Sequence, residues 1–269
     1  MYRVVVKKFK SLEDPDKKGS PTGQASRLNS QTSELATLYL CFMQNKTTSV
    51  FEEGKVILID KPLFWTSFGV IQKIRNIIQV KKVGHAGTLD PRATGLLIIC
   101  TGKFTKKINE YMAREKEYTG TITLGAVTPT YDLETDPVNF KPTEAITAEQ
   151  IHSLTKSFTG DILQVPPAHS AIKVGGTRVY ELARQGKEVK LEPRKLFIKE
   201  FRITKIEMPV IHFLVVCSTG TYIRSLANDF GEALGCGGYL SSLCRTRIGE
   251  FQLKDAYSIE TFEEEVKNL

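Results

Sequence analysis

The stretch GHAGTLDPRATGLLIIC, residues 84–100, joins a glycine-rich polar segment to a run of apolar residues. The apolar part, from Leu96 to Cys100, is typical of a buried strand. Glycine at three positions permits backbone angles that are closed to other residues, and Pro91 keeps Asp90 out of the helical region. The stretch therefore predicts a turn that presents the Asp90 carboxylate and is anchored by a core strand.

An Asp-Pro pair often does no more than start a turn or cap a helix. Here His85, Thr88 and Arg92 lie within five residues of Asp90. A nearby guanidinium favours the ionised form of a carboxylate, so the pattern favours a nucleophile or base over an acid. We interpret the segment as a functional site.

The composition limits the class of protein. The chain has 269 residues, 41% of them hydrophobic, which is enough to bury a full core. No apolar run approaches the roughly 20 residues that cross a bilayer, and no signal peptide is recognised, so we expect a cytoplasmic protein. Five cysteines without a CxxC pair are expected to be reduced, and four scattered histidines indicate no metal site.

The formal net charge of +7 is weak evidence for a nucleic-acid partner. The clustering of the basic residues near the glycine-rich and aromatic segments is more useful evidence. Each group taken alone is about as often a solvated surface as a nucleic-acid contact. The groups are Lys81 and Lys82; Lys103, Lys106, Lys107, Arg114 and Lys116; and Arg245 and Arg247.

Strand and helix patterns interleave after residue 50 and predict a mixed α/β or α+β fold on one large sheet. Strands are predicted at 55–60, 96–100, 118–125, 197–206 and 211–217. Helices are predicted from an N-cap at Ser67, from a capping box at Thr147 to Phe158, from Arg178 to Gln185, and after Gly220.

Two arginines are candidate partners for Asp90. Arg224 begins the helix after Gly220. Arg92 lies two residues from Asp90, and its side chain is able to point away from the carboxylate. An exposed helix residue is the plainer interpretation of Arg224. Tyr118 is placed to stack on a planar base, although a half-buried aromatic is more common. No phosphate loop, dinucleotide fingerprint or nucleophile elbow competes with the Asp90 site.

Six short segments stand in a fixed order along the chain: DKP at 60–62, GHAGTLDP and ATG at 84–95, KEY at 116–118, TYD at 130–132, PP through SAIK at 166–173, and GTYIR at 220–224. Together they resemble the motifs of the TruB-type tRNA pseudouridine synthases. The resemblance covers about residues 51–250. It implies the pseudouridine synthase fold, an α+β fold with a large mixed, mostly antiparallel sheet, flanking helices and a central RNA-binding cleft.

The resemblance implies that the chain isomerises a uridine of the tRNA TΨC loop, with Asp90 as the catalytic aspartate. Arg224 would pair with that carboxylate, and Tyr118 would stack on the flipped uracil. The base must leave the stack and stay shielded while its C1′–N1 bond is exchanged for a C1′–C5 bond. Attack at C1′, addition to C6 and proton abstraction at C2′ all remain open as the role of the carboxylate.

Three further residues resemble family residues around the substrate. His85 matches the histidine that helps to hold the extruded nucleotide, Asp132 the polar residue of its pocket, and Lys61 the lysine that supports the active-site loop. The resemblance implies the T-arm of tRNA as the partner and no cofactor or metal. We expect a monomer without a membrane association.

Three regions are expected along the chain. Residues 1–50 are predicted to be a disordered extension, within which Met43 is a candidate for the true start. Residues 51–250 are expected to form the catalytic domain, and 251–269 a tail with a helix at 258–267 but no full PUA domain. Without that RNA-binding domain, the lysines at 103, 106 and 107 are predicted to carry phosphate contacts.

Two other functions remain open from the residues alone. A protein that binds and refolds tRNA without chemistry would keep its effect after Asp90→Asn, whereas a synthase would lose tritium release from 5-labelled uridine. A hydrolase with an aspartate nucleophile or a metal would be sensitive to EDTA and would release a small product.

Overall fold

The computed structural model describes residues 50–167, 173–174, 177–178 and 191–269. The extension predicted at 1–50 therefore lies outside the described residues except for its last position. The same holds for 179–185 of one predicted helix, and its first residue, Arg178, lies in a short strand instead.

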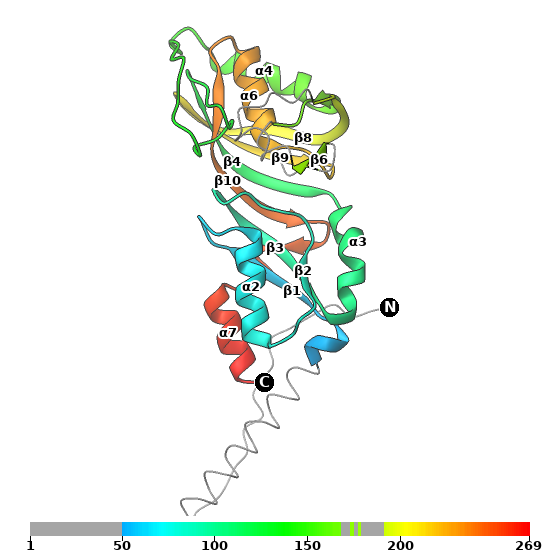
Figure 1. Cartoon of the computed structure of the whole chain (residues 1–269). Coiled ribbons are helices and arrows are strands. Elements are labelled where there is room, and N and C mark those ends of the chain that lie inside the picture. Colours follow the sequence, from blue (N-terminus) through cyan, green and yellow to red (C-terminus); the bar gives the residue numbers. More distant parts are fainter. Residues whose placement is uncertain (1–49, 168–172, 175–176, 179–190) are drawn as a thin grey trace, which may run out of the picture.

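A mixed sheet of nine strands runs through the described part of the molecule (Figure 1). Seven strands follow the order β1-β3-β10-β4-β9-β8-β5, while β2 pairs with β3 and β11 with β10. Only β3 and β10 run parallel within it. The bounds are β1 Val56–Lys61, β2 Val83–His85, β3 Ala93–Thr101, β4 Lys116–Leu124, β5 Gly160–Gln164, β8 Arg194–Glu207, β9 Val210–Cys217, β10 Gly238–Ile248 and β11 Phe251–Gln252. The predicted α+β fold with a mostly antiparallel sheet is confirmed.

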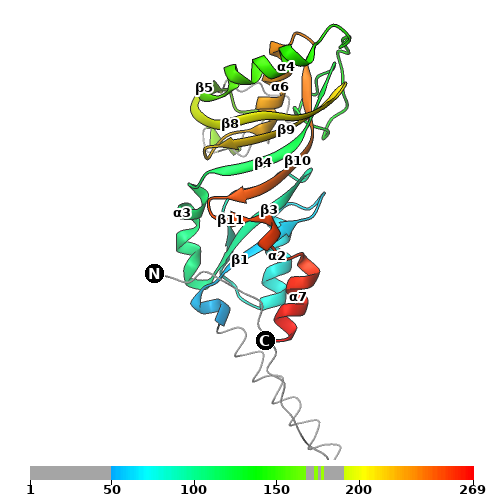
Figure 2. The same cartoon turned by 180° about the vertical axis from the view of Figure 1, so that it is seen from behind.

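Helices pack near the two ends of this sheet (Figures 1 and 2). Near β1, α2 (Ser67–Ile78) and α7 (Ile259–Lys267) share an apolar cluster with that strand and β3. Near β8, α4 (Ala148–Leu154) and α6 (Ile223–Ala233) share a second cluster with β4 and β9. The parallel β3–β10 pair joins the two halves at the middle of the sheet.

The smaller elements complete the description. They are η1 Gly102–Lys107, α3 Ile108–Met112, η2 Thr155–Phe158, η3 Leu253–Asp255, and the separate pair β6 Lys173–Val174 and β7 Thr177–Arg178. The helix predicted at 258–267 is confirmed as α7, which begins after its N-cap Ser258 and buries Ile259 and Phe262.

Two helix predictions need correction. Thr66 is the N-cap of α2, because its side chain accepts a hydrogen bond from the Gly69 N–H. The Ser67 hydroxyl is buried and binds the backbone of Leu89 instead. The capping box at Thr147 is confirmed, but the α-helix ends at Leu154 and the turn that follows, through Phe158, is a 3₁₀-helix.

Candidate active site

The Asp90 loop, residues 86–92, connects β2 to β3. The Ser67 hydroxyl donates to the Leu89 carbonyl at 3.0 Å and accepts from the Leu89 N–H at 2.9 Å. On the other side, the Ala93 N–H donates to the Asp90 carbonyl at 3.0 Å. The backbone is therefore fixed on both sides of Asp90, while the Asp90 side chain is 42% exposed.

Arg224 reaches the Asp90 carboxylate from the other half of the sheet, at the beginning of α6. Its Nε lies 2.9 Å from Asp90 Oδ2, and its Nη1 donates to the Thr130 carbonyl at 3.2 Å. The Arg224 side chain is only 6% exposed, so its charge is held in the interior, whereas the Asp90 carboxylate that it meets is partly open to solvent. The interpretation of Arg224 as an exposed helix residue is therefore wrong, because the first turn of α6 faces the interior.

Asp132 approaches the same guanidinium from the loop after β4. Its Oδ2 lies 3.7 Å from Arg224 Nε, and its Oδ1 accepts a hydrogen bond from the Glu134 N–H at 2.9 Å. The preceding residue, Tyr131, has a left-handed φ of 64°, and its carbonyl accepts from the Leu240 N–H of β10 at 2.9 Å. These contacts fix the buried Asp132 beside the middle of the sheet.

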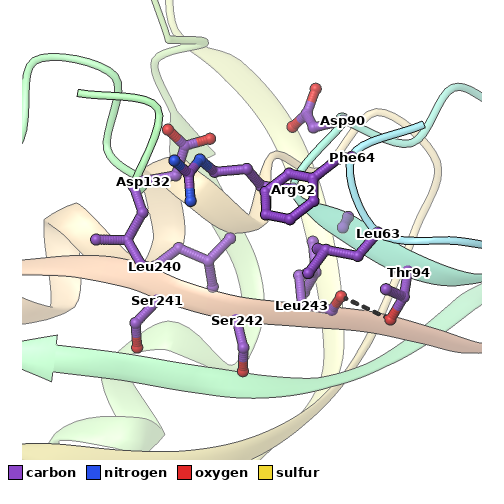
Figure 3. Close-up of a pocket in the computed structure, with 12 residues that line it drawn as sticks. Leu63, Phe64, Asp90, Arg92, Thr94, Asp132, Leu240, Ser241, Ser242 and Leu243 are labelled. Atoms are coloured by element: carbon purple, nitrogen blue, oxygen red, sulfur yellow. Dashed lines mark hydrogen bonds between the residues drawn. The ribbon is translucent and has the colours of Figure 1, made fainter. Parts of the chain in front are cut away.

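A cavity of about 380 Å³ opens beside these charges (Figure 3). Asp90, Asp132 and Arg92 line it together with residues 240–243 of β10 and residues 63 and 64 of the segment that follows β1. Its volume lies in the range of small-ligand sites. The cavity is at the parallel β3–β10 junction, so both halves of the molecule contribute to it.

Lys61 connects the segment after β1 to the Asp90 loop. Its fully buried Nζ donates to the carbonyl oxygens of Pro62 at 2.9 Å, Trp65 at 2.7 Å and Pro91 at 3.4 Å. Burial lowers the pKa of Lys61 to about 8, although the nearby charge of Asp90 opposes this shift. The residue therefore lies where a loop-supporting lysine is expected.

Tyr118 and His85 are not among the residues that line the cavity. Tyr118, in β4, is 8% exposed, and burial raises the pKa of its phenol against the opposing charge of Arg245. Burial, and then the charge of Arg245, lower the pKa of His85 at the end of β2. The charge of Arg245 acts on both side chains, so both lie near that residue.

Arg245 is the site residue that the sequence did not reveal, since its basic neighbourhood pointed equally to a solvated surface. It is 1% exposed, its Nε donates to the Leu96 carbonyl at 2.8 Å, and its Nη2 donates to the Gly87 carbonyl at 3.0 Å. Gly95 pairs with it, and a Cβ there would lie 2.4 Å from the Arg245 carbonyl oxygen. No local pattern marks such a residue, because its acceptors lie far away in sequence.

Other classes of site are not found in the described part of the chain. Within it, no group of three or more histidine, cysteine, aspartate or glutamate side chains is arranged to hold a metal ion. No helix described there is long and apolar enough to cross a membrane. The cysteines at 100, 217, 236 and 244 are free.

Two family models match this chain, one over the segment that contains Asp90 and the other over the segment that begins with Arg224. The model described as TruB family pseudouridylate synthase (N terminal domain) matches residues 75–223, and the one described as tRNA pseudouridylate synthase B C-terminal domain matches residues 224–268. The chain belongs to the TruB family of pseudouridylate synthases. It is therefore an isomerase, and the family predicted from its six motifs is confirmed.

Curated relatives extend the likeness along most of the chain. The tRNA pseudouridine synthase B of Flavobacterium johnsoniae is 53% identical over 228 residues, which are 82% of this chain and 100% of the relative. The tRNA pseudouridine synthase B of Chlorobaculum tepidum is 46% identical over 228 residues, which are 83% of this chain and 95% of the relative.

Solved structures show the same fold. A Cbf5-Nop10-Gar1 complex matches with a TM-score of 0.62 and 28% identity over 81% of this chain and 56% of that chain. An H/ACA RNP bound to a substrate RNA containing 2′-deoxyuridine matches with a TM-score of 0.59 and 26% identity, over 80% and 53% of the respective chains. The chain spans about half the length of these solved chains.

Proposed function

We propose that this chain converts the uridine at position 55 of tRNA, in the TΨC loop of the T-arm, into pseudouridine, with Asp90 as the catalytic carboxylate. The names of the curated relatives and the substrate RNA in one matched structure support an RNA substrate. One observation carries the assignment of Asp90: a partly exposed carboxylate lines the cavity and forms an ion pair with the buried Arg224 at 2.9 Å.

The charges around Asp90 suit this chemistry. Attack at C1′, addition to C6 and proton abstraction at C2′ each require an ionised carboxylate in a fixed position. The Arg224 guanidinium complements that charge and orients it, while Lys61 holds the backbone of the Asp90 loop. None of these routes needs a cofactor or a metal.

The remaining family roles are part of the proposal. Asp132 would line the uracil pocket, and His85 would help to hold the extruded nucleotide. Tyr118 would stack on the uracil, which requires its ring to become more accessible than its 8% exposure when RNA binds. The enzyme would act as a cytoplasmic monomer.

Pseudouridine mapping in bulk tRNA tests the proposed position. Cells that lack the protein are expected to lose pseudouridine at position 55 and to regain it with the wild-type chain but not with Asp90→Asn. Restoration of pseudouridine by Asp90→Asn would contradict the catalytic role proposed for that carboxylate. An unchanged modification map would overturn the proposed substrate position.

A further inference from the structure

The segment after β1 and the first turn of α2 carry apolar side chains that the roles above do not use. Phe64 is 67% exposed, Phe68 is 62% exposed and Trp65 is 37% exposed. Large apolar side chains that gather at a surface often mark a binding site. Phe64 also lines the cavity that holds Asp90, so this group is continuous with the proposed RNA site (Figure 3).

The backbone holds the Phe64 ring outside the core. Its φ of 65° is left-handed, a conformation that is sterically disfavoured for a bulky side chain and that often occurs at functional sites. The Phe64 N–H donates to the Pro91 carbonyl at 2.8 Å. Lys61 Nζ donates to the carbonyl of Trp65, the residue that follows Phe64. Since Pro91 follows Asp90 directly, these bonds hold the backbone of Phe64 against the Asp90 loop.

A cation accompanies the ring. The guanidinium carbon of the exposed Arg92 lies 5.7 Å from the centroid of the Phe64 ring. Aromatic rings stack on unpaired bases of any sequence, and guanidinium groups pair with phosphates. An exposed ring beside an exposed guanidinium therefore matches the base and the phosphate of one nucleotide.

We propose that Phe64 and Arg92 form a stacking platform for an unpaired nucleotide next to the reacting uridine in the RNA. The base stacks on Phe64, and its phosphate pairs with Arg92. This inference rests on one part of the proposed function, namely that an RNA loop enters the Asp90 cavity. It adds a binding element to this cavity, formed by two residues to which the proposed function gives no role.

Binding of a T-arm hairpin tests the platform, measured in an Asp90→Asn background so that catalysis does not affect the readout. Phe64→Gly removes the ring and suits the left-handed φ, so the variant is expected to fold. We expect about tenfold weaker binding for Phe64→Gly and Phe64→Leu, and near wild-type binding for Phe64→Trp. Phe140→Ala, which removes another exposed phenylalanine that does not line the cavity, is the matched control and should bind normally.

Hairpins that lack one base identify the occupant. If the platform holds a neighbouring base, one abasic hairpin binds about tenfold more weakly, and Phe64→Gly then weakens its binding no further. The same tenfold loss on every abasic hairpin, or normal binding by Phe64→Gly, would overturn the platform. Failure of the proposed function would appear separately, as wild-type protein that binds the hairpin but forms no pseudouridine.

Discussion

Two buried arginines contact the Asp90 loop, and their partners differ. Arg224 meets the carboxylates of Asp90 and Asp132, at 2.9 and 3.7 Å. Arg245 is buried as deeply, but the hydrogen bonds described for it go to the backbone carbonyls of Gly87 and Leu96. The comparison indicates that one cation orients the Asp90 carboxylate, while the other shapes the loop that presents it.

The largest effect is expected for Arg224→Ala. The variant leaves Asp132 buried without its cation and frees the Asp90 side chain to change orientation. We expect kcat/KM for tRNA to fall about 10³-fold, the size seen when a charge-stabilising group is removed from an active site. We also expect about 2 kcal/mol loss in the free energy of unfolding. Single-turnover rates and urea unfolding measure the two. Near wild-type kcat/KM would contradict the role given to Arg224.

Arg245→Met should affect the free energy of unfolding more than it affects kcat/KM. The Gly87 and Leu96 carbonyls each lose a charge-assisted hydrogen bond, so unfolding should become about 2 to 3 kcal/mol easier. Removal of the charge should also raise the pKa of His85 towards its usual value, which titration by NMR would detect. If the variant kept full stability and lost only kcat/KM, the distinction between the two arginines would fail.

Lys61 gives a pH-dependent test on the Asp90 side of the site. Its pKa is lowered from 10.5 to about 8, so between these pH values the folded state binds fewer protons than the unfolded state. Its contribution therefore makes the free energy of unfolding rise with pH across that window. Activity should fall above pH 8 instead, because the neutral amine binds the Pro91 carbonyl and the Asp90 charge less firmly.

A matched lysine controls this prediction. The pKa of Lys116 is also lowered to about 8 by burial, but its Nζ donates to the Met112 carbonyl in a different part of the fold. The alkaline fall in kcat/KM should persist in Lys116→Met and disappear from the reduced activity of Lys61→Met. A fall that survives in Lys61→Met would have another origin.

The smallest effect is expected from the lysines at 103, 106 and 107. They follow the end of β3 that is remote from Asp90, and eight steps along a strand span about 26 Å. Replacing all three with alanine should flatten the slope of log binding constant against log salt by about 2. Lys73→Ala, whose ammonium already pairs with Glu263, should change it little. An unchanged slope in the triple variant would remove these lysines from the RNA-binding surface.

The accuracy of prediction from the sequence depended on the range of the contacts. The capping box at Thr147 and the alternating strand at 118–125 use neighbouring residues, and both were predicted correctly. Ser67 was wrongly predicted as an N-cap, since its hydroxyl binds Leu89 in another segment. Arg245 was missed for the same reason, because two distant carbonyls stabilise its burial.

The site residues also differ in whether neighbouring positions or distant segments determine them. The glycines and Pro91 predicted the presented Asp90 from a few adjacent residues. The residues alone could not decide between Arg92 and Arg224, because the choice depends on how α6 packs against the Asp90 loop. The left-handed φ of Phe64 also had no sequence signal, and its N–H binds Pro91 in another segment of the chain.

Tritium release from tRNA labelled at C5 of uridine, measured in parallel with tRNA binding, tests the central claim most directly. The account predicts release by the wild-type chain, and no detectable release by an Asp90→Asn variant that still binds tRNA. Release by the Asp90→Asn variant at the wild-type rate would contradict the claim that this carboxylate carries out the isomerisation.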